Sequence, residues 1–250
     1  MPDDWLLELG HTRLKLARRV DGGLSGIEAI ELDRFGQWLA ARRPGRGDRF
    51  WLAAVPMPDV TARVSGELVR AGLDWTSVST DSASLPVAAS YPGMGVDRWL
   101  ALQPAWARVR SALCLVDCGT ATTVDLVGAC GRHLGGWIMP GMEAARQGLL
   151  TRAPGLRRPA VGSPAVPGPA RDTAEAVESG LLLQQAGGIV QAYTLATGLP
   201  EFAPAPPVLL TGGAAAPLQS LLEGRGLSVR VEPDLVLQGL AMAVESMSER

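Results

Sequence analysis

The chain alternates short apolar runs with longer stretches in which apolar side chains recur at helical spacing. Apolar runs bounded by glycine or polar residues are typical of buried strands, and the longer amphipathic stretches predict helices. Strands are predicted at residues 5–9, 14–17, 50–55, 113–117, 122–127, 134–139 and 208–211. Helices are predicted at residues 60–71, 98–107, 142–150, 173–195 and 235–248. Five prolines between residues 154 and 169 predict a surface loop. The alternation as a whole predicts an α/β fold.

A strand–turn–strand pattern occurs twice in the chain. The first copy is WLLELGHTRLKL, near the start, and the second is LCLVDCGTATTVDL, near the middle. In each copy an apolar strand is followed by an acid, one further residue, a glycine, a nearby threonine and a second strand. The matching positions are Glu8, Gly10 and Thr12 in one copy, and Asp117, Gly119 and Thr120 in the other. The repeat predicts two similar halves around a cleft, at residues 1–110 and 111–250.

The two turns have a composition that suits a nucleotide phosphate. Glycine lets the backbone approach a ligand closely, and the N–H groups of such a turn attract anions. Threonine hydroxyls add neutral donors. A carboxylate would repel a bare phosphate, so its presence favours a cation between the two. An ordinary β-hairpin with a glycine turn is the alternative for either copy alone. The common P-loop and GxGxxG motifs are absent from the sequence, which disfavours those two nucleotide folds.

Residues 90–102, SYPGMGVDRWLAL, place a glycine-containing loop before a predicted helix that opens with Asp97 and Arg98. An acid at the start of a helix usually serves as a cap or as a favourable first-turn charge. The functional interpretation is a general base beside a guanidinium that binds an anionic group of a substrate. From this segment alone, the capping interpretation is preferred.

The overall composition excludes several classes of function. Hydrophobic residues make up 47% of the 250 residues and the net charge is −2, so there is material for a core but no basic block. This argues against a general nucleic-acid-binding protein. No apolar run reaches the roughly 18 residues of a membrane span. The start, MPDDWLLELG, lacks the features of a signal peptide. We therefore expect a cytoplasmic protein that binds neither nucleic acid nor membrane.

Two residue types are used in an informative way. The three cysteines, Cys114, Cys118 and Cys130, are not spaced as zinc ligands, and we expect buried free thiols. Lys15 is the only lysine among 23 basic residues. Because an ammonium is not interchangeable with a guanidinium, a lone lysine in an arginine-rich chain invites a functional interpretation. Chance survival on a strand is the alternative.

Seven segments, taken together and in order, resemble type III pantothenate kinases across nearly the whole chain. They are residues 8–15, 95–98, 117–120, 135–141, 172–180, 211–213 and 233–239. The resemblance implies a duplicated ribonuclease-H-like fold of the actin/Hsp70/sugar-kinase superfamily. It also implies a homodimer that uses ATP to phosphorylate pantothenate to 4′-phosphopantothenate, the first step of coenzyme A biosynthesis.

The resemblance further implies a role for each matching residue. Asp97 is the implied catalytic base. The implied pantothenate-binding residues are Tyr91, Gly95, Val96, Asp97, Arg98 and Thr173. The residues implied to bind ATP are Glu8, Leu9, Gly10, His11, Thr12, Arg13, Leu14, Lys15 and Thr120. Asp117 is implied to hold a monovalent cation, K⁺ or NH₄⁺, and Mg²⁺ accompanies the ATP.

The first loop departs from the family pattern at two positions. The family has Asp-x-Gly-Asn, whereas this chain has Glu8 and His11 in place of the aspartate and asparagine. Glutamate moves the charge outward by one methylene, and an error near 1 Å can cost on the order of 100-fold in rate. One alternative is therefore a catalytically silent family member that acts as a ligand-binding or regulatory accessory protein. Another kinase or phosphatase of the superfamily is a third hypothesis, which the match around Asp97 and Thr173 disfavours.

Overall fold

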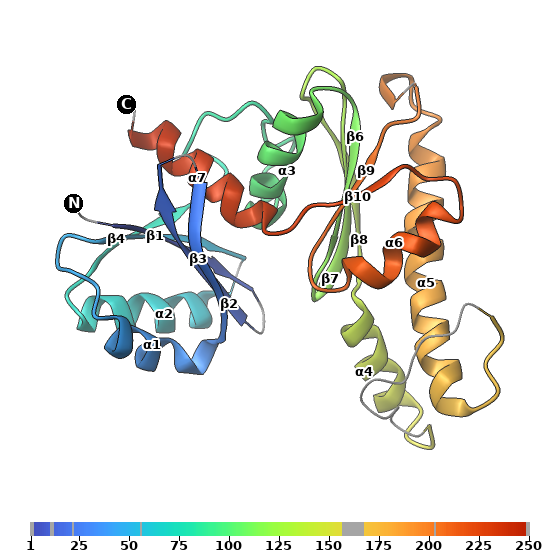
Figure 1. Ribbon diagram of the computed structural model, residues 1–250, viewed down its shortest axis with the longest axis horizontal. Helices are drawn as coiled ribbons and strands as arrows, with labels where there is room; N and C mark the ends of the chain where they lie inside the picture. Colours follow the sequence, from blue (N-terminus) through green and yellow to red (C-terminus); the bar gives the residue numbers. More distant parts are fainter. Residues whose placement is uncertain are drawn as a thin grey trace. The chain divides into compact units, whose positions relative to one another are not determined.

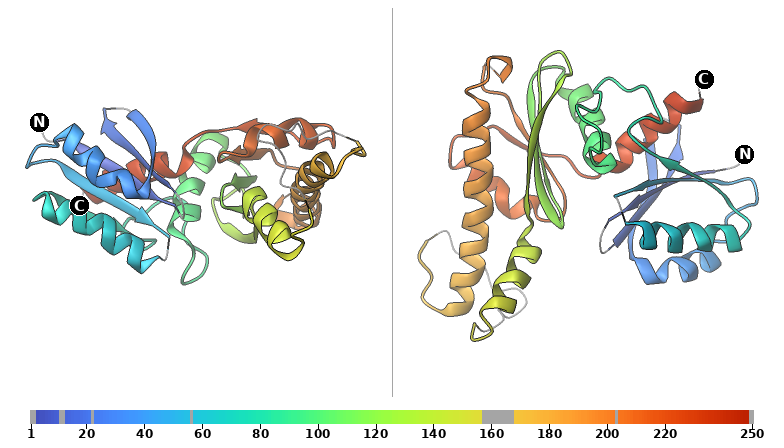
Figure 2. Two further views of the ribbon diagram at one scale, coloured as in Figure 1. Left: turned by 90° about the horizontal axis from the view of Figure 1, so that it is seen from below. Right: turned by 180° about the vertical axis from the view of Figure 1, so that it is seen from behind.

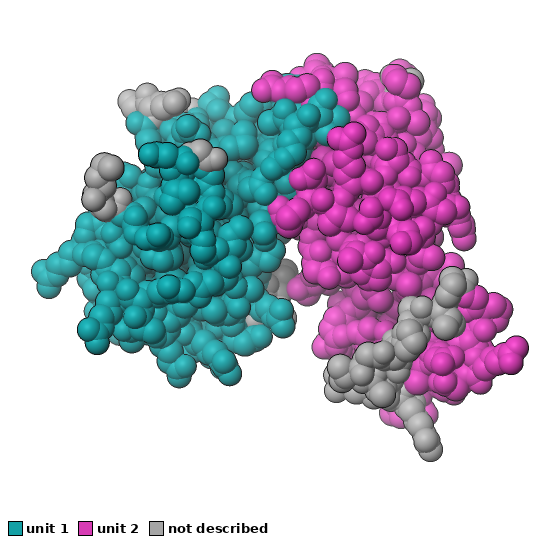
Figure 3. All heavy atoms as spheres, viewed as in Figure 1, with its two compact units in different colours: residues 1–109, 131–133, 234–250 teal, residues 110–130, 134–233 magenta. Residues whose placement is uncertain are grey.

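The computed structural model describes residues 3–10, 13–21, 23–55, 57–156, 168–202 and 204–248. The chain forms two compact units (Figure 3). The first contains residues 1–109, 131–133 and 234–250, and the second contains residues 110–130 and 134–233. Most of the predicted proline-rich loop lies outside the described residues. The predicted boundary between similar halves at residue 110 remains a prediction.

The first unit is built on a five-stranded sheet with the order β3-β2-β1-β4-β5. β2 is antiparallel to β1 and β3, whereas β4 is parallel to β1 and β5. The strands are β1 (Asp4–Leu9), β2 (Arg13–Val20), β3 (Gly23–Glu31), β4 (Arg49–Ala54) and β5 (Asp74–Val78). The helices are η1 (Leu32–Arg34), α1 (Phe35–Arg42), α2 (Pro58–Arg70), α3 (Val96–Val109) and α7 (Leu235–Ser248).

Alternation along β1 separates two layers of helices in the first unit. Trp5, Leu7 and Leu9 lie in one buried cluster with side chains of α1 and α2, because alternate residues of a strand share a face. Figures 1 and 2 show α1 and α2 side by side on this face of the sheet. α7 packs against α3 and against the strands of the same sheet. The sheet of the first unit is therefore covered by helices on both faces.

The second unit is built on another five-stranded sheet, with the order β8-β7-β6-β9-β10. β6 is antiparallel to β7 and parallel to β9. The strands are β6 (Leu113–Cys118), β7 (Ala121–Val127), β8 (His133–Pro140), β9 (Val208–Thr211) and β10 (Val229–Val231). The helices are α4 (Met142–Arg152), α5 (Thr173–Ala196), η2 (Pro200–Phe202) and α6 (Ala215–Glu223). Within the described ranges, no helix is both long and apolar enough to cross a membrane.

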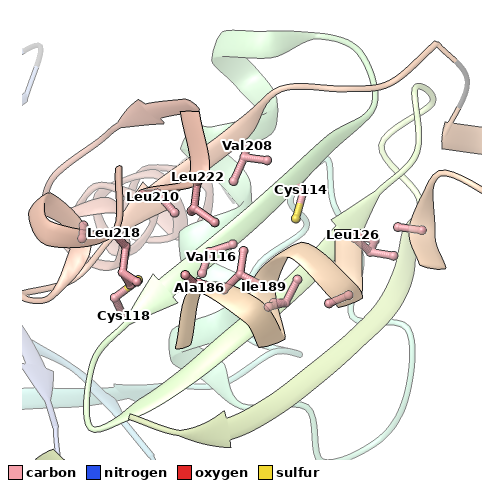
Figure 4. Packing of buried hydrophobic residues seen from close by; sticks show 14 of the residues in the cluster. Cys114, Val116, Cys118, Leu126, Ala186, Ile189, Val208, Leu210, Leu218 and Leu222 are labelled. Carbon is pink, nitrogen blue, oxygen red and sulfur yellow. The ribbon is translucent and has the colours of Figure 1, made fainter. Parts of the chain in front are cut away.

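The core of the second unit forms between its sheet and two helices. Cys114, Val116 and Cys118, alternate residues of β6, belong to one buried cluster with Ala186 and Ile189 of α5 (Figure 4). α6 contributes Leu218 and Leu222 to the same cluster. The apolar residues of α5 in this cluster recur at three- and four-residue spacing, which places them on one face of the helix. This packing fixes the end of β6, where the second repeated turn begins.

The two sheets have the same topology. β6 takes the place of β1, since each is the central strand, pairs antiparallel with the strand that follows it, and pairs parallel with a later strand. Glu8 and Asp117 are each the penultimate residue of that central strand. The predicted repeat is therefore confirmed in three dimensions, and its two acids occupy equivalent positions.

The three cysteines fall into two classes. Cys114 and Cys118 are buried free thiols, as predicted, but Cys130 is exposed, so the prediction was wrong for that residue. Cys130 lies in the turn between β7 and β8, outside the strands of the sheet, where its side chain is exposed. Burial, together with a smaller contribution from the neighbouring Asp117 charge, raises the pKa of the Cys118 thiol to about 12. Burial, with a smaller contribution from Asp125, also raises the pKa of Cys114.

We expect a single cysteine to react with Ellman's reagent in the native protein at pH 8, and all three to react in guanidinium chloride. The thiolate is the reactive species, and the raised pKa values keep the two buried thiols neutral at that pH. Absorbance at 412 nm measures the number of reacting thiols. The Cys130→Ser variant should lose the fast reaction. Rapid reaction of a second thiol in the native protein would contradict the buried positions of Cys114 and Cys118.

Candidate functional site

Asp117 lies at the edge of the second sheet where β6 and β9 end and β7 begins. It pairs with Thr123 of β7 on one side and with Thr211 of β9 on the other. Gly212 follows β9 with a backbone φ of +89°, and a Cβ atom there would lie 2.5 Å from Asp117 Oδ1. The bare backbone at Gly212 thus leaves the space that the half-buried carboxylate occupies.

Backbone hydrogen bonds fix the turn that follows Asp117. Cys118 O accepts from Ala214 N at 3.1 Å, and Thr120 O accepts from Gly141 N at 3.0 Å. Gly119 closes the β6–β7 hairpin by donating its N–H to the next strand. Thr120 itself is exposed, so its hydroxyl is accessible to a ligand. The turn is a rigid element of the second unit that presents a hydroxyl and a carboxylate.

The donor set around Asp117 suits a weakly held, hard cation. Carboxylate, carbonyl and hydroxyl oxygens are the ligands that alkali and alkaline-earth ions prefer. Among the described residues, no three His, Cys, Asp or Glu side chains are grouped so that they could hold a metal ion. A cation at Asp117 would therefore have at most two such side chains as ligands, with neutral oxygens as the others. The residues present thus fit a weakly held cation.

The first repeated turn joins β1 and β2 in the first unit. Glu8 and Lys15 are direct cross-strand partners, and Gly10 N donates to Arg13 O at 3.0 Å across the turn. The side chains of Leu9 and Leu14 are buried in the core, so these two residues could contact a nucleotide only through their backbone. Arg13 is exposed and forms an ion pair with Glu31 at 3.3 Å. His11 and Thr12 lie outside the described residues.

The only lysine in the sequence has a defined partner in the first unit. Lys15 Nζ donates to Asp234 Oδ1 at 3.3 Å, and both side chains are partly exposed. Asp234 has a backbone φ of +56°, a left-handed conformation that Asp adopts more readily than most residues. Asp234 immediately precedes α7, so the start of this helix orients the Lys15 ammonium on β2. Sequence reasoning gave Asp234 no role, because nothing local links positions 219 residues apart.

Five of the predicted pantothenate-binding residues lie together around the start of α3. Asp97 is the second residue of the helix, and its Oδ1 accepts from Arg98 N at 2.9 Å. Arg98 is buried, and its Nη1 donates to the Tyr91 hydroxyl at 2.8 Å. A Cβ at Gly95 would lie 2.5 Å from Asp97 Oδ1, so only glycine leaves room for the carboxylate in this position. Val96, the first residue of α3, is buried.

Thr173 begins α5 in the second unit and is exposed. Asp172 caps this helix, because its Oδ1 accepts from Glu175 N at 3.0 Å. The first unit brings together Tyr91, Gly95, Asp97 and Arg98 and, separately, Glu8 and Lys15. Asp117, Thr120 and Thr173 belong to the second unit.

Two duplicated sheets with ligand-type turns after their central strands define a fold class, that of actin-like proteins and sugar kinases. Two solved structures of this kind cover nearly the whole chain. One is a conserved protein of Campylobacter jejuni assigned to the Baf family of transcriptional activators, with a TM-score of 0.65, 15% identity, and coverage of 98% of this chain and 100% of that one. The other, assigned as a 2-dehydro-3-deoxygalactonokinase of Sinorhizobium meliloti, has a TM-score of 0.58, 16% identity, and coverage of 97% and 98%. The predicted fold class is confirmed.

The chain belongs to the type III pantothenate kinase family, whose model matches residues 6–194. A type III pantothenate kinase of Alkalilimnicola ehrlichii is 35% identical over 251 aligned residues, which cover 96% of this chain and 97% of the relative. One of Pseudomonas aeruginosa is 42% identical over 159 residues, which cover 61% of this chain. That match spans 60% of the relative's own length. The resemblance found in the sequence is therefore confirmed.

Proposed function

We propose that this protein transfers the γ-phosphoryl group of ATP to the primary hydroxyl of pantothenate, giving 4′-phosphopantothenate for coenzyme A synthesis. The observation that carries the proposal is the group formed by Gly95, Asp97, Arg98 and Tyr91 at the start of α3. It combines a proton acceptor, a buried cation and a phenol in one place. These are the groups that a neutral hydroxyl acceptor with a remote carboxylate requires.

Asp97 acts as the general base in this proposal. The hydrogen bond from Arg98 N orients the Asp97 carboxylate, which accepts the proton of the attacking hydroxyl in the reaction. Arg98 supplies the positive charge that attracts the pantothenate carboxylate. Tyr91 accepts from Arg98 Nη1, so its own O–H can donate to the acceptor molecule. Gly95 and Val96 provide close backbone contact, and Thr173 adds a further hydroxyl contact.

The two repeated turns bind ATP in this proposal. Residues 8–15 form the first phosphate loop, with backbone N–H groups and the Lys15 ammonium as donors. Thr120 is the contact from the second loop. Phosphoryl transfer depends mainly on alignment and charge neutralisation, and these donors supply both. In the reaction the hydroxyl oxygen bonds to the γ-phosphorus, the bond from that phosphorus to the β–γ bridging oxygen breaks, and ADP leaves.

Two kinds of cation complete the proposed site. Asp117 and neutral oxygens of the β6–β7 turn would hold K⁺ or NH₄⁺, and Mg²⁺ would bind with ATP. Their chemistry there is neutralisation of the phosphate charge that gathers in the transition state. We further propose that the protein is a cytoplasmic homodimer. Its partners are then pantothenate, ATP and a second copy of the chain.

A catalytically silent, ligand-binding or regulatory member of the family is the second candidate function. The observation that favours it is Glu8, which replaces the usual aspartate at the position equivalent to Asp117. The longer side chain shifts the carboxylate relative to the phosphate loop. The acceptor group around Asp97 retains every implied residue, which favours the active kinase.

We expect the purified protein to phosphorylate pantothenate with MgATP, and to do so faster in KCl than in NaCl of equal concentration. The family resemblance implies K⁺ or NH₄⁺ at Asp117, so the smaller Na⁺ should support the reaction less well. A pyruvate kinase and lactate dehydrogenase coupled assay measures ADP formation, with the coupling enzymes tested separately in each salt because pyruvate kinase itself uses K⁺. The Asp117→Asn variant should lose the difference between the salts. A folded protein without turnover at high ATP and K⁺ would favour the silent family member.

A further inference from the structure

A buried histidine, His133, lies next to the acceptor group, the cluster formed by Tyr91, Gly95, Asp97 and Arg98, without belonging to it. His133 is 4% exposed and forms the end of the three-residue segment 131–133 that belongs to the first unit. Its Nδ1 is 2.7 Å from Ser90 Oγ, a hydrogen-bond distance. A polar ring in a site this enclosed must be matched by hydrogen bonds.

Hydrogen bonds at two residues anchor the loop that leads into α3. At Val87, the backbone O accepts from Trp99 Nε1 at 2.9 Å and from Gln103 Nε2 at 2.8 Å, which ties the loop to the helix. At Ser90, the hydroxyl is tied to His133. The next residue along the chain is Tyr91, which is 42% exposed. His133 therefore fixes Ser90, the residue directly before Tyr91, whose side chain is proposed to contact pantothenate.

His133 also contacts that side chain directly. The rings of Tyr91 and His133 have centroids 6.4 Å apart and are tilted by 36°. On its other side, the Tyr91 hydroxyl accepts from the buried Arg98. Tyr91 is thus held between an imidazole at its ring and a guanidinium at its hydroxyl. Without the imidazole, an exposed tyrosine on a loop would sample several rotamers, and the binding of an acceptor would have to order it.

We infer that His133 is a positioning residue for the acceptor substrate: through Ser90 and the Tyr91 ring it preorganises the Tyr91–Arg98 pair that binds pantothenate. The inference rests on the proposed function. It predicts a selective loss of affinity for pantothenate when His133 is changed, because the contacts with Ser90 and Tyr91 both lead to the residues proposed to bind pantothenate. Substitution of a residue important only for folding would lower the affinity for both pantothenate and ATP, or would leave both affinities unchanged.

The test compares two substitutions that remove the Ser90–His133 hydrogen bond from its two ends. His133→Phe keeps a ring against Tyr91 but removes the hydrogen bond, and Ser90→Ala removes the same bond from an exposed position. We expect each to raise KM for pantothenate about 5- to 10-fold, the factor typical of one lost hydrogen bond, with KM for ATP unchanged. The double variant should show no further increase. His133→Asn, which restores a hydrogen-bonding atom near Nδ1, should recover most of the affinity.

Ser82→Ala is the matched control. Ser82 is in the same loop, and its hydroxyl accepts from Ser79 N at 2.9 Å, so its loss removes a comparable bond far from Tyr91 along the loop. We expect wild-type KM values for this variant. An unchanged KM for pantothenate in Ser90→Ala, or an equal increase in both KM values, would overturn the inference.

Calorimetric titration with pantothenate separates the two hypotheses. If the wild-type protein neither turns over nor binds pantothenate, the proposed function is wrong. If it binds pantothenate and Ser90→Ala binds equally tightly, only the role of His133 is wrong. Should His133→Phe fail to fold, as judged by its thermal transition, the Ser90→Ala and Ser82→Ala pair still decides the question.

Discussion

Replacement of Asp97 by asparagine should lower kcat about 10³-fold while leaving pantothenate binding nearly unchanged. A positioned general base typically contributes 10²- to 10⁴-fold, and an amide cannot accept the proton of the attacking hydroxyl. The amide oxygen can still accept from Arg98 N, so the helix start and the Tyr91–Arg98 contact should persist. Steady-state assay gives kcat, and calorimetric titration gives the affinity for pantothenate.

Asp59→Asn provides the matched control for this prediction. Asp59 is the second residue of α2, as Asp97 is of α3, and it is exposed. Both substitutions remove a first-turn carboxylate, which is worth about 0.3–1 kcal/mol to helix stability. The two variants should therefore unfold at similar temperatures, and only Asp97→Asn should lose activity. Near-normal turnover by Asp97→Asn would exclude its role as the base.

Replacement of Gly212 by alanine should abolish most activity, because it should displace the β6–β7 turn that carries Asp117 and Thr120. The new methyl group would lie 2.5 Å from Asp117 Oδ1 and 2.7 Å from the carbonyl of Cys118. The carbonyl belongs to a hydrogen-bonded backbone that cannot move aside cheaply, so the turn must shift. A shift near 1 Å costs on the order of 100-fold in rate. Overpacking of this kind also costs about 1–3 kcal/mol of stability. Turnover and thermal unfolding measure the two effects.

Gly226→Ala separates backbone strain from the steric clash. Gly226 has a φ of +82°, close to the +89° of Gly212, but a Cβ there would meet no atom within 4 Å. It lies between α6 and β10 in the same unit, away from Asp117 along the chain. We expect a stability loss of about 1 kcal/mol with full activity. If Gly226→Ala lowered activity as much as Gly212→Ala, general strain rather than displacement of the loop would be the cause.

Among the described residues, the sequence predicted every helix of eleven or more residues and missed the shorter ones, together with three strands. Every predicted strand and helix is present, with ends that differ by a few residues. The missed elements are β3, η1, α1, β5, η2, α6 and β10. Residues of β3 are mostly half-buried or exposed and β10 has three residues, so neither gives a clear apolar period. Such elements exist because a neighbouring strand or helix already provides a surface to pair with, which tertiary structure decides and local pattern does not.

The candidate site was predictable where its residues are neighbours in sequence. Gly95, Asp97 and Arg98 lie within four residues, so a local motif contained their arrangement. Together with six other segments it indicated the family, which is confirmed. Contacts between distant segments were not predictable in this way. The pairing of Lys15 with Asp234 and that of Ser90 with His133 depend on how the chain folds back in the first unit. A polar residue in a turn gives no sign in the sequence of the partner it will meet.

The first unit is assembled from segments at both ends of the chain, and this arrangement sets an order for folding during synthesis. Its sheet lies within the first 109 residues, but α7, whose Leu237, Leu240 and Val244 are buried, begins only at residue 235. Residues 110–233 therefore leave the ribosome before the helix that completes the earlier unit. Nascent domains usually fold in the order in which they are made. Here the later unit can close first, while one apolar face of the earlier sheet stays open to chaperones until translation has passed α7.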